Sequence, residues 1–388
     1  MTSTEHFSKR NLVELVDSGE EFIRKQEAII LGAVREIHIQ TYIFESDETG
    51  LRIVKALKEA AKSGEIKIYV LVDAYGSQNF NNLLRKELID AGIHFRRFGK
   101  FYSSGSFHIG RRLHQKIIVA DGELAMVGGF NISNKYTNQP GSPAWLDFAV
   151  QVKGDVARRL LLICRKRWMK TSFRSFPKKL REGIVTSQNP SPEVRVKASQ
   201  NDYINRKNEI ALTYRKVIGS SKKSITIVGG YFLPGGRMRR ILAQASERGV
   251  DIRILVSDAS DVKLVQLARR YLYSWLLRHH IRIYEYLPSN VHGKVLLCDD
   301  EFVSIGSYDL NNLSTYSNIE LNLDINDADF SGIVNQKLNV IFEKDCRLLT
   351  EESFRKRFGI FDKLLSWIGY QLVKTFFVLS LLFAKKSE

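Results

Sequence analysis

The sequence predicts an α/β protein built from two similar halves, and two observations lead to this prediction. Strand-like and helix-like apolar patterns follow one another in the same order in both parts of the chain. A short polar motif also occurs once in each part, at equivalent places. With 388 residues and 44% hydrophobic residues, the chain is long enough for two domains with buried cores. We expect an α/β sandwich in each half.

The first half begins with a strand, a helix and a second strand. Residues 36–43 alternate polar and apolar side chains, as a half-buried strand does, and residues 51–62 change to helical spacing. A further strand is expected over 66–73. A strand, a crossover helix and another strand imply that the two strands pair in parallel.

The second half repeats this order. A strand over 225–228 precedes a helix over 238–248 and a strand over 250–256. The repetition predicts that both halves share one topology. The expected limits are 1–157 for the first half, 158–198 for a basic amphipathic helix and linker, 199–350 for the second half, and 351–388 for a basic and apolar C-terminal tail.

The polar motif repeats five positions in identical register, 178 residues apart. Its members are His114, Lys116, Asp121, Gly128 and Gly129 in the first copy, and His292, Lys294, Asp299, Gly306 and Ser307 in the second. Chance rarely repeats five positions in register within one chain. We therefore expect the fold to bring the two His/Lys pairs together.

Each copy of the motif is predicted to lie on a buried strand. Residues 115–120 and 293–298 are rich in branched apolar side chains and end at a turn. The period of two in a strand places each His and its Lys on one face. A second strand, 124–127 or 302–305, leads into the glycines, where missing side chains would let a phosphate approach the backbone.

The spacing of the motif, His-x-Lys, four residues, Asp, six residues and then Gly-Gly or Gly-Ser, resembles that of the phospholipase D superfamily. The surrounding sequence is similar to that of bacterial cardiolipin synthases. The segments that carry this similarity are Tyr42-Ile43-Phe44, Asn131, Trp145-Leu146-Asp147, Tyr231-Phe232-Leu233-Pro234, Tyr284-Glu285-Tyr286 and Asn318-Ile319-Glu320. The resemblance covers roughly residues 20 to 345. It implies two α/β sandwich halves with mixed sheets, related by a pseudo-twofold axis, with the active site at their interface.

Two His/Lys pairs suit the transfer of a phosphodiester. The anionic phosphate repels nucleophiles, so lysines that neutralise its oxygens lower the barrier to attack. One His can attack phosphorus and form a phosphohistidine, while the other protonates the leaving oxygen and then deprotonates the incoming alcohol. The resemblance implies that His114 is the nucleophile, that His292 is the acid and base, and that Lys116 and Lys294 bind the phosphate. The sequence alone does not order the two histidines.

Further contacts are expected around the phosphate. Asn131 is implied as an additional donor, and Gly129 and Ser307 are expected to bind substrate. Asp147 and Glu320 follow the two motifs at similar distances and could orient the imidazoles through hydrogen bonds. Solvated loop acids are the alternative interpretation of these two residues.

Three further aspartates lie in or close to the two copies of the motif. Asp121 and Asp299 complete the motif and are grouped with the catalytic residues, but they follow a strand end and are expected to be structural or electrostatic partners. Asp309 stands 178 residues after Asn131, where the resemblance leads us to expect Asn. A carboxylate there would repel phosphate unless it is turned away or protonated.

We expect neither a metal nor another cofactor. The three cysteines, Cys164, Cys298 and Cys346, lie far apart and show neither zinc spacing nor a disulfide framework. The histidines outside the motif form no metal-ligating pattern. Two lysines can supply the positive charge that a metal would otherwise bring to a phosphate.

Positive charge and an apolar tail indicate the partners. The net charge of +17 favours phosphate-bearing polymers or anionic membranes. Residues 158–181 carry ten Lys or Arg and no acid, which suits a membrane surface, a nucleic acid, or a structural helix followed by a charged linker. Residues 364–384 contain one charge, Lys374, and a polar stripe in their first part. We favour a helix in the membrane interface over one that spans the bilayer, and both over one docked on the soluble core.

The first thirty residues contain charged positions throughout and no apolar region typical of a secretory signal. We therefore expect the bulk of the chain to be cytoplasmic. The expected location is the cell membrane, to which the protein would bind peripherally or by an anchor over 364–384.

These features predict a phosphatidyltransferase that forms cardiolipin and glycerol from two phosphatidylglycerols through a phosphohistidine. The expected partners are anionic phospholipids, phosphatidylglycerol among them, and a membrane surface, whereas the apolar tail argues against nucleic acid. A hydrolase of phospholipase D type and a nuclease of the same superfamily are the alternatives. A noncatalytic lipid-binding scaffold is disfavoured, because both copies of the motif keep His and Lys. The sequence does not fix the oligomeric state.

Overall fold

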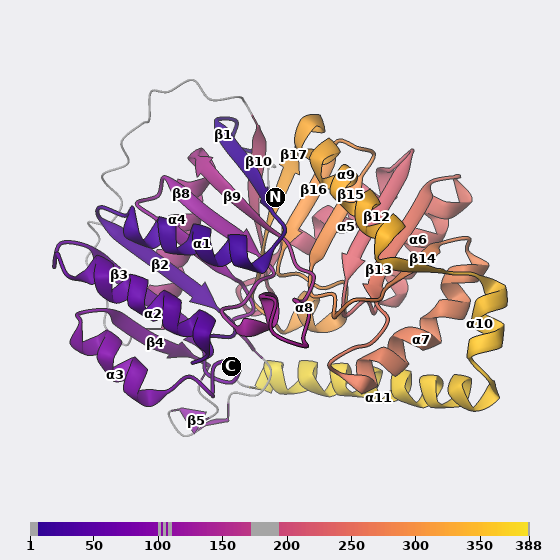
Figure 1. Ribbon diagram of the computed structural model, residues 1–388. Coiled ribbons are helices and arrows are strands. Elements are labelled where there is room, and N and C mark those ends of the chain that lie inside the picture. Colours follow the sequence, from indigo (N-terminus) through magenta and orange to yellow (C-terminus); the bar gives the residue numbers. More distant parts are fainter. Residues whose placement is uncertain (1–6, 100–101, 104–105, 108–110, 172–193, 387–388) are drawn as a thin grey trace.

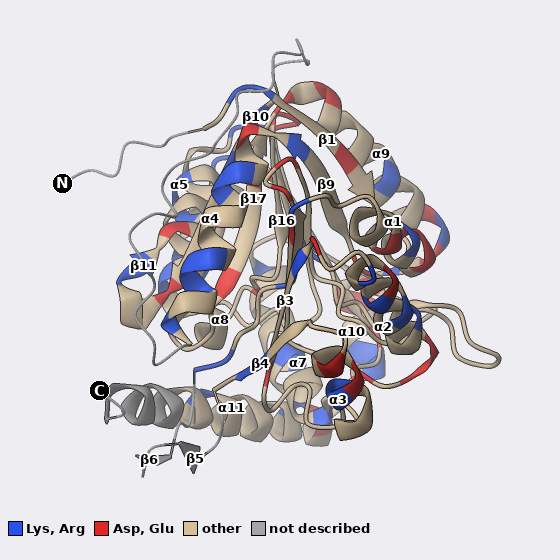
Figure 2. Cartoon of the chain, turned by 90° about the vertical axis from the view of Figure 1, so that its left-hand side faces the viewer, with Lys and Arg blue, Asp and Glu red and all other residues tan. Residues whose placement is uncertain are grey.

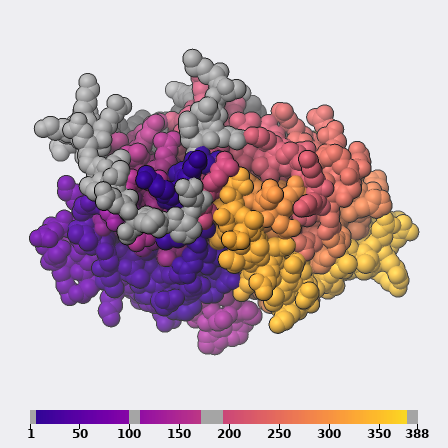
Figure 3. Space-filling view, turned by 90° about the horizontal axis from the view of Figure 1, so that it is seen from above, coloured from indigo at the N-terminus to yellow at the C-terminus, as the bar shows by residue number. Residues whose placement is uncertain are grey.

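The computed structural model describes residues 7–99, 102–103, 106–107, 111–171 and 194–386. Figure 1 shows two α/β halves side by side, and the space-filling view in Figure 3 shows the same two bodies in contact. One half contains a seven-stranded sheet and the other a nine-stranded sheet. Both sheets mix parallel and antiparallel pairs, so the predicted α/β class with mixed sheets is confirmed.

In the first half, the sheet has the order β1-β9-β8-β7-β2-β3-β4. These strands are β1 (Asn11–Val16), β2 (Glu36–Thr41), β3 (Lys67–Asp73), β4 (His94–Phe98), β7 (Ile117–Ala120), β8 (Leu124–Gly128) and β9 (Ala149–Gly154), and β5 (Tyr102–Ser103) with β6 (Ser106–Phe107) forms a separate hairpin. The helices are α1 (Gly19–Leu31), α2 (Glu48–Ala61), α3 (Asn82–Asp90) and α4 (Asp155–Lys170). β2 and β3 pair in parallel across α2, as the sequence predicts.

The sheet of the second half has the order β11-β10-β17-β16-β15-β12-β13-β14-β18. These strands are β10 (Arg195–Asp202), β11 (Lys207–Asn208), β12 (Ser224–Gly229), β13 (Asp251–Ser257), β14 (Arg282–Tyr286), β15 (Lys294–Cys298), β16 (Phe302–Gly306), β17 (Glu320–Asn326) and β18 (Cys346–Leu349). The helices are α5 (Glu209–Ser220), α6 (Gly236–Glu247), α7 (Lys263–Arg278), α8 (Asn312–Tyr316), α9 (Ala328–Lys344), α10 (Glu351–Arg357) and α11 (Ile360–Lys386). β12 and β13 pair in parallel across α6, which repeats β2, α2 and β3.

One apolar core crosses the boundary between the halves. It joins β7, β8 and β9 of the first sheet to β15, β16 and β17 of the second, with α4 and α9 packed against them. Two isolated parallel bridges connect chain segments of the two halves, one between Leu113 and Ile319 and one between Leu146 and Val291. These bridges lie directly beside the motif histidines in sequence, so the interface fixes where the two motifs meet.

Helix α4 begins at Asp155, before the predicted limit between the first half and the linker. Leu160, Cys164 and Trp168 on this helix are buried. Its charges, prominent in Figure 2, include Arg165 and Arg167, which are paired with Glu36 and Asp202. The described part of the basic segment 158–181 is therefore a structural helix of the core. The rest of that segment lies outside the described residues.

Helix α11 is docked on the second half along α7, as Figure 1 shows. Its residues Val373 and Phe377 are buried in a cluster with Leu233, Ala268 and Leu272. Docking on the core, the alternative ranked last from the sequence, thus holds for one face of the helix. Large apolar side chains are exposed elsewhere on it: Ile360, Phe361, Leu364, Leu365, Trp367, Ile368, Leu372 and Phe376. Among the described residues, no helix has the length and apolarity to cross a membrane.

Candidate active site

The motif brings both histidines to one cavity. β7 and β15 lie inside their sheets, and His114 and His292, just before them, line a cavity of about 740 Å³ with residues from both halves. The backbone N–H of His114 donates to the carbonyl of Ile319 at 3.0 Å, and that of His292 donates to the carbonyl of Leu146 at 2.8 Å. Each histidine is therefore fixed to backbone from the opposite half.

The two imidazoles are oriented by carboxylates in a crossed arrangement. Nδ1 of His114 lies 3.0 Å from Oε2 of Glu320, and Nδ1 of His292 lies 2.6 Å from Oδ2 of Asp147. Both carboxylates are buried, and each belongs to the half opposite its histidine. Because Nδ1 faces the carboxylate, Nε2 is the ring nitrogen left for the substrate.

Gly129 and Ser307, expected to bind substrate, contact these carboxylates instead. A Cβ atom at Gly129 would lie 2.1 Å from Oδ1 of Asp147, so the missing side chain leaves room for that carboxylate. At the equivalent place in the second half, the hydroxyl of Ser307 donates to Glu320, which also accepts a hydrogen bond of 3.1 Å from Asn318. The structure thus corrects the prediction that phosphate approaches the backbone here, because protein atoms fill this space.

The structure also places Asp121 and Asp299 outside the catalytic group. The carboxylate of Asp121 accepts three backbone N–H bonds of 2.8 Å from residues 34–36. That of Asp299 accepts bonds from the hydroxyl of Ser221 and from the backbone N–H groups of 222–224. Each aspartate holds the end of its motif strand to the start of a neighbouring strand. The structural role expected from their position therefore fits, and their grouping with the catalytic residues does not.

The two motif lysines lie behind the histidine backbones. Nζ of Lys116 donates to the carbonyl of His114, and Nζ of Lys294 donates to that of His292. Both lysine side chains are almost fully buried. Burial lowers the pKa of Lys116 to about 7, and the positive charge of Lys294 adds to this effect. A bound anionic phosphate would favour the charged form of Lys116.

Asn131 and Asp309 occupy equivalent positions but differ in their bonding. Both line the cavity. Oδ1 of Asn131 accepts from the backbone N–H of Ile43 at 3.1 Å, and its Nδ2 donates to the hydroxyl of Tyr136 at 2.8 Å. Asp309 lies 3.7 Å from Nζ of Lys294, and its Oδ1 is buried without a hydrogen-bond partner. Burial raises the pKa of Asp309, so its carboxyl can carry a proton and donate a hydrogen bond to a phosphate.

Three tyrosines at the site have no role assigned to them from the sequence. The hydroxyl of Tyr136 lies 3.2 Å from Nδ1 of His292. The ring of Tyr42 lies 5.4 Å from Nζ of Lys116, and the ring of Tyr231 lies 6.0 Å from Nζ of Lys294. Tyr42 and Tyr231 belong to segments that carry the family resemblance, so the sequence could have indicated that these two tyrosines lie at the site. No motif indicated Tyr136.

The electrostatic environments of the two His–carboxylate pairs differ. Burial raises the pKa of Asp147 to about 7, and burial together with the two lysines lowers the pKa of His292. Burial also opposes ionisation of Glu320, but His114 and Lys116 outweigh it and hold the pKa of Glu320 below its usual value. Glu320 is therefore ionised at neutral pH, whereas Asp147 can retain a proton there.

The outer wall of the cavity is apolar and is built from α7, α8 and α11 together with the segments before α7 and after β12. The side chains that form it are Leu233, Val262, Val265, Leu313, Phe376 and Phe377. Arg112 and Lys135 add positive charge to the lining. The cavity thus joins a polar floor with two histidines to an apolar wall on the side of the exposed face of α11.

In the part of the chain that the structure describes, no cluster of three or more His, Cys, Asp or Glu is arranged to hold a metal ion. The two buried lysines place positive charge beside the histidines, which would offset the charge of a phosphate bound there. Two histidines in one cavity, each held by a buried carboxylate and backed by a buried lysine, are the groups of an enzyme that transfers phosphodiesters.

Comparison with known proteins identifies the family. A family model described as "Cardiolipin synthase, PLD-like domain" matches residues 27–141 and 214–346. The chain is 31% identical over 363 residues to cardiolipin synthase B of Salmonella typhi, which covers 89% of this chain and 84% of that protein. It is 30% identical over 369 residues to cardiolipin synthase 1 of Staphylococcus epidermidis, covering 90% of this chain and 71% of the relative. The chain therefore belongs to the cardiolipin synthase family within the phospholipase D superfamily.

A solved structure shares the fold over nearly the whole chain. The crystal structure of phosphatidylserine synthase from Haemophilus influenzae superposes with a TM-score of 0.73 and 14% sequence identity, covering 97% of this chain and 96% of that one. This similarity supports the fold of two α/β halves.

Proposed function

We propose that this chain joins two molecules of phosphatidylglycerol into cardiolipin and glycerol, through a phosphohistidine on His114. The observation that carries the proposal is the pair of histidines in one cavity, each oriented by a buried carboxylate from the opposite half. Membership of the cardiolipin synthase family supports a phospholipid as the substrate.

In the first step, Nε2 of His114 attacks phosphorus and the bond from phosphorus to the glycerol oxygen breaks. His292 gives its proton to that oxygen, and glycerol leaves. The ionised Glu320 stabilises the positive imidazole ring that carries the phosphatidyl group. The raised pKa of Asp147, about 7, lets this carboxyl share a proton with His292. This difference between the two pairs favours His114 as the nucleophile.

In the second step, a hydroxyl of another phosphatidylglycerol gives its proton to His292 and attacks phosphorus. The bond from phosphorus to His114 then breaks, and cardiolipin is released. Lys116 and Lys294 offset the negative charge on the phosphate oxygens in both steps. A protonated Asp309 donates a hydrogen bond to the phosphate from the second half.

The apolar outer wall supports transfer to an alcohol instead of water. Phe376 and Phe377 of α11 line the cavity together with apolar residues that include Val265. Such a wall accepts acyl chains and limits the access of water to the phosphohistidine. The hydroxyl of a lipid then competes well with water for the phosphatidyl group.

The exposed apolar face of α11 is the proposed membrane contact. Leu364, Ile368 and Leu372 on this helix are exposed to solvent, and Phe376 belongs both to this apolar surface and to the cavity lining. A docked helix whose free face is apolar is suited to lie in the interface of a bilayer. We propose that it rests on the cytoplasmic leaflet of the cell membrane, where substrate can enter the cavity from the lipid side.

A reconstitution assay tests this function. Purified full-length protein is incubated with phosphatidylglycerol vesicles, with and without a chelator, and lipid products and glycerol are measured. Cardiolipin with an equal amount of glycerol, lost in His114→Ala, is the expected result. Phosphatidic acid without cardiolipin would instead identify a hydrolase, and cleavage of added plasmid with unchanged lipid would identify a nuclease.

A further inference from the structure

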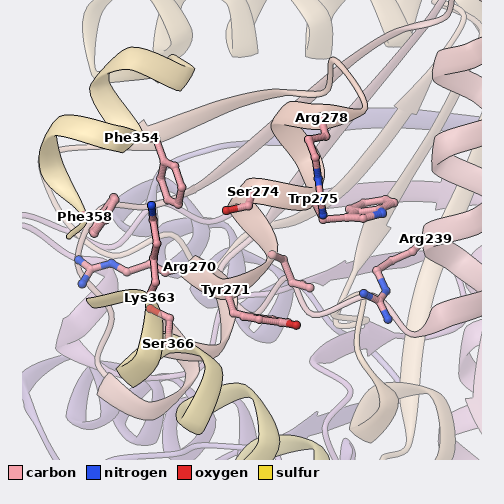
Figure 4. A pocket seen from close by; sticks show the side chains of 11 residues that line it. Arg239, Arg270, Tyr271, Ser274, Trp275, Arg278, Phe354, Phe358, Lys363 and Ser366 are labelled. Atoms are coloured by element: carbon pink, nitrogen blue, oxygen red, sulfur yellow. The ribbon is translucent and has the colours of Figure 1, made fainter. Parts of the chain in front are cut away.

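A second pocket lies beside α11, separate from the active-site cavity. Its volume is about 230 Å³, and it shares no lining residue with the catalytic cavity. Residues of α6, α7, α10 and α11, together with Phe358, form it, as Figure 4 shows. Ser366 lines this pocket and Phe376 lines the catalytic cavity. At about 1.5 Å per helical residue, roughly 15 Å of α11 separates the two sites.

Four cations and no carboxylate line this pocket. They are Arg239 of α6, Arg270 and Arg278 of α7, and Lys363 of α11. Among the described residues, none of the four side chains forms an ion pair with an acid. The Nε atoms of Arg239 and Arg270 are buried and have no hydrogen-bond partner. Buried donors without acceptors favour an anionic ligand that supplies them.

The cations of the neighbouring helix α10, unlike those of the pocket, form ion pairs with carboxylates. Its Arg355 and Lys356 are paired with Glu351 and Glu352 on the same helix. Arg357 is paired with acids of the second half. The chain therefore pairs the cations of α10 with its own carboxylates, whereas no described carboxylate lies within ion-pair distance of the four pocket cations, although Asp258 attracts Arg270 at longer range.

Aromatic rings cover part of two of these cations, Arg239 and Arg270, whereas Arg278 and Lys363 are exposed. The guanidinium of Arg239 lies 5.9 Å from the ring of Trp275, and that of Arg270 lies 5.0 Å from the ring of Phe358. Figure 4 shows Lys363 beside the two Phe rings on one side and Arg239 and Arg278 around Trp275 on the other. In such an apolar setting, attraction between a cation and an anion is screened less than it is in water.

The pocket opens next to the apolar face of α11. At about 100° per residue, Lys363 lies between the docked side of the helix, which contains Ser366 and Val373, and the exposed side, which contains Leu364. A lipid whose acyl chains lie along the exposed side would place its phosphate near Lys363. Long basic side chains at this level of a membrane bind lipid phosphates in the same way.

We propose that this pocket binds the phosphodiester head group of an anionic phospholipid that is not the reacting substrate. The pocket fixes one lipid beside α11 and gives the enzyme a preference for anionic over zwitterionic membranes. This inference rests on the proposed membrane contact of α11, but it does not depend on the chemistry at His114. The apolar face next to the pocket favours a lipid over a nucleic acid as the source of the phosphate.

A pair of matched double variants tests the pocket. In Arg239→Gln/Arg278→Gln two pocket cations are removed, and in Arg237→Gln/Arg240→Gln the same charge is removed from exposed positions of α6 outside the pocket. Flotation of the full chain is measured with vesicles of phosphatidylglycerol in phosphatidylcholine and of phosphatidylcholine alone. We expect the pocket variant to lose roughly tenfold or more of its preference for anionic vesicles and the control variant to lose much less.

Two further measurements distinguish lipid binding at this pocket from catalysis at the active site. Transferase activity on short-chain phosphatidylglycerol dispersed in detergent should be equal in both double variants, so failure of catalysis and failure of the pocket appear in different assays. Lys363→Gln, at an exposed position, should weaken anionic binding without affecting folding, even if the double pocket variant fails to fold. Equal losses in the two double variants would overturn the proposal. So would equal flotation of the wild-type protein with phosphatidylglycerol-containing vesicles and with vesicles of phosphatidylcholine alone, because no preference for anionic lipid would then exist.

Discussion

Asp147 and His292 lie in different halves of the chain, yet Oδ2 of Asp147 is 2.6 Å from Nδ1 of His292. Glu320 and His114 repeat this relationship in the opposite direction at 3.0 Å. Each half supplies one histidine together with the carboxylate that orients the other histidine. The interface between the halves is therefore part of the site, and neither half holds a complete set of these groups.

The crossed carboxylates should affect turnover more than substrate binding. We expect Glu320→Gln and Asp147→Asn to lower kcat by about 100-fold or more with little change in KM, because a wrongly oriented imidazole fails mainly in the transition state. Asp324→Asn is the matched control, since Asp324 is a buried carboxylate of the same strand as Glu320 but bonds Ser199 and Ser304. Steady-state kinetics would contradict this prediction if the control and Glu320→Gln lost similar activity.

Gly129 and Ser307 should respond differently to substitution, because they contact the two carboxylates differently. Gly129→Ala places a methyl group where Oδ1 of Asp147 lies, so the carboxylate must move and both kcat and the melting temperature should fall. Ser307→Gly removes one hydrogen bond to Glu320, which contributes about 1 kcal/mol to stability. Measurements of thermal unfolding and of kcat for both variants test these effects. If Gly129→Ala keeps the wild-type kcat and melting temperature, the carboxylate of Asp147 does not lie against Gly129.

Ionisation of Asp147 should cost stability at high pH. Its pKa is raised to about 7 in the folded protein, mainly by burial, but has its ordinary value in the unfolded chain. Between these two values the folded state binds more protons, so this group makes the protein less stable as pH rises through that window. Asp147→Asn removes the effect, and we expect its melting temperature relative to wild type to be higher at about pH 8 than at about pH 4. A difference that is independent of pH would refute the prediction.

The exposed face of α11 should be required for membrane binding but not for folding. We expect Leu364→Glu/Leu372→Glu, at side chains 51% and 55% exposed, to abolish most binding to phosphatidylglycerol vesicles. Ile333→Glu/Val340→Glu, at 54% and 41% exposed positions on α9, is the control and should bind normally. Flotation measures both variants, and equal binding by the two would rule out α11 as the contact.

The sequence predicted the halves, the strands and the meeting of the motifs, because the period of two and the repeated register are local properties. It could not tell which carboxylate serves which histidine. The distances from His114 to Asp147 and from His292 to Glu320 along the chain suggest partners within a half, whereas packing of the halves exchanges them. Such pairing depends on tertiary contacts that spacing does not encode.

Two other differences between the sequence-based prediction and the structure also arise from tertiary contacts. Gly129 was expected to admit a phosphate, but Asp147 from a neighbouring segment fills that space. Apolar residues occur on both sides of α11 beside its polar stripe, and the sequence does not distinguish the side that packs on α7, with Val373, from the side that faces solvent, with Leu372. Apolar patterns predict burial but do not name what covers each face.

The proposed roles of the histidines, in which His114 carries the phosphatidyl group and His292 moves protons, can be tested by trapping the intermediate. Wild-type protein is mixed with phosphatidylglycerol, denatured rapidly in alkali, and digested for mass spectrometry. We expect the phosphatidyl adduct on the peptide that contains His114, and none in His114→Ala. An adduct on the peptide that contains His292 would show that the two roles are reversed.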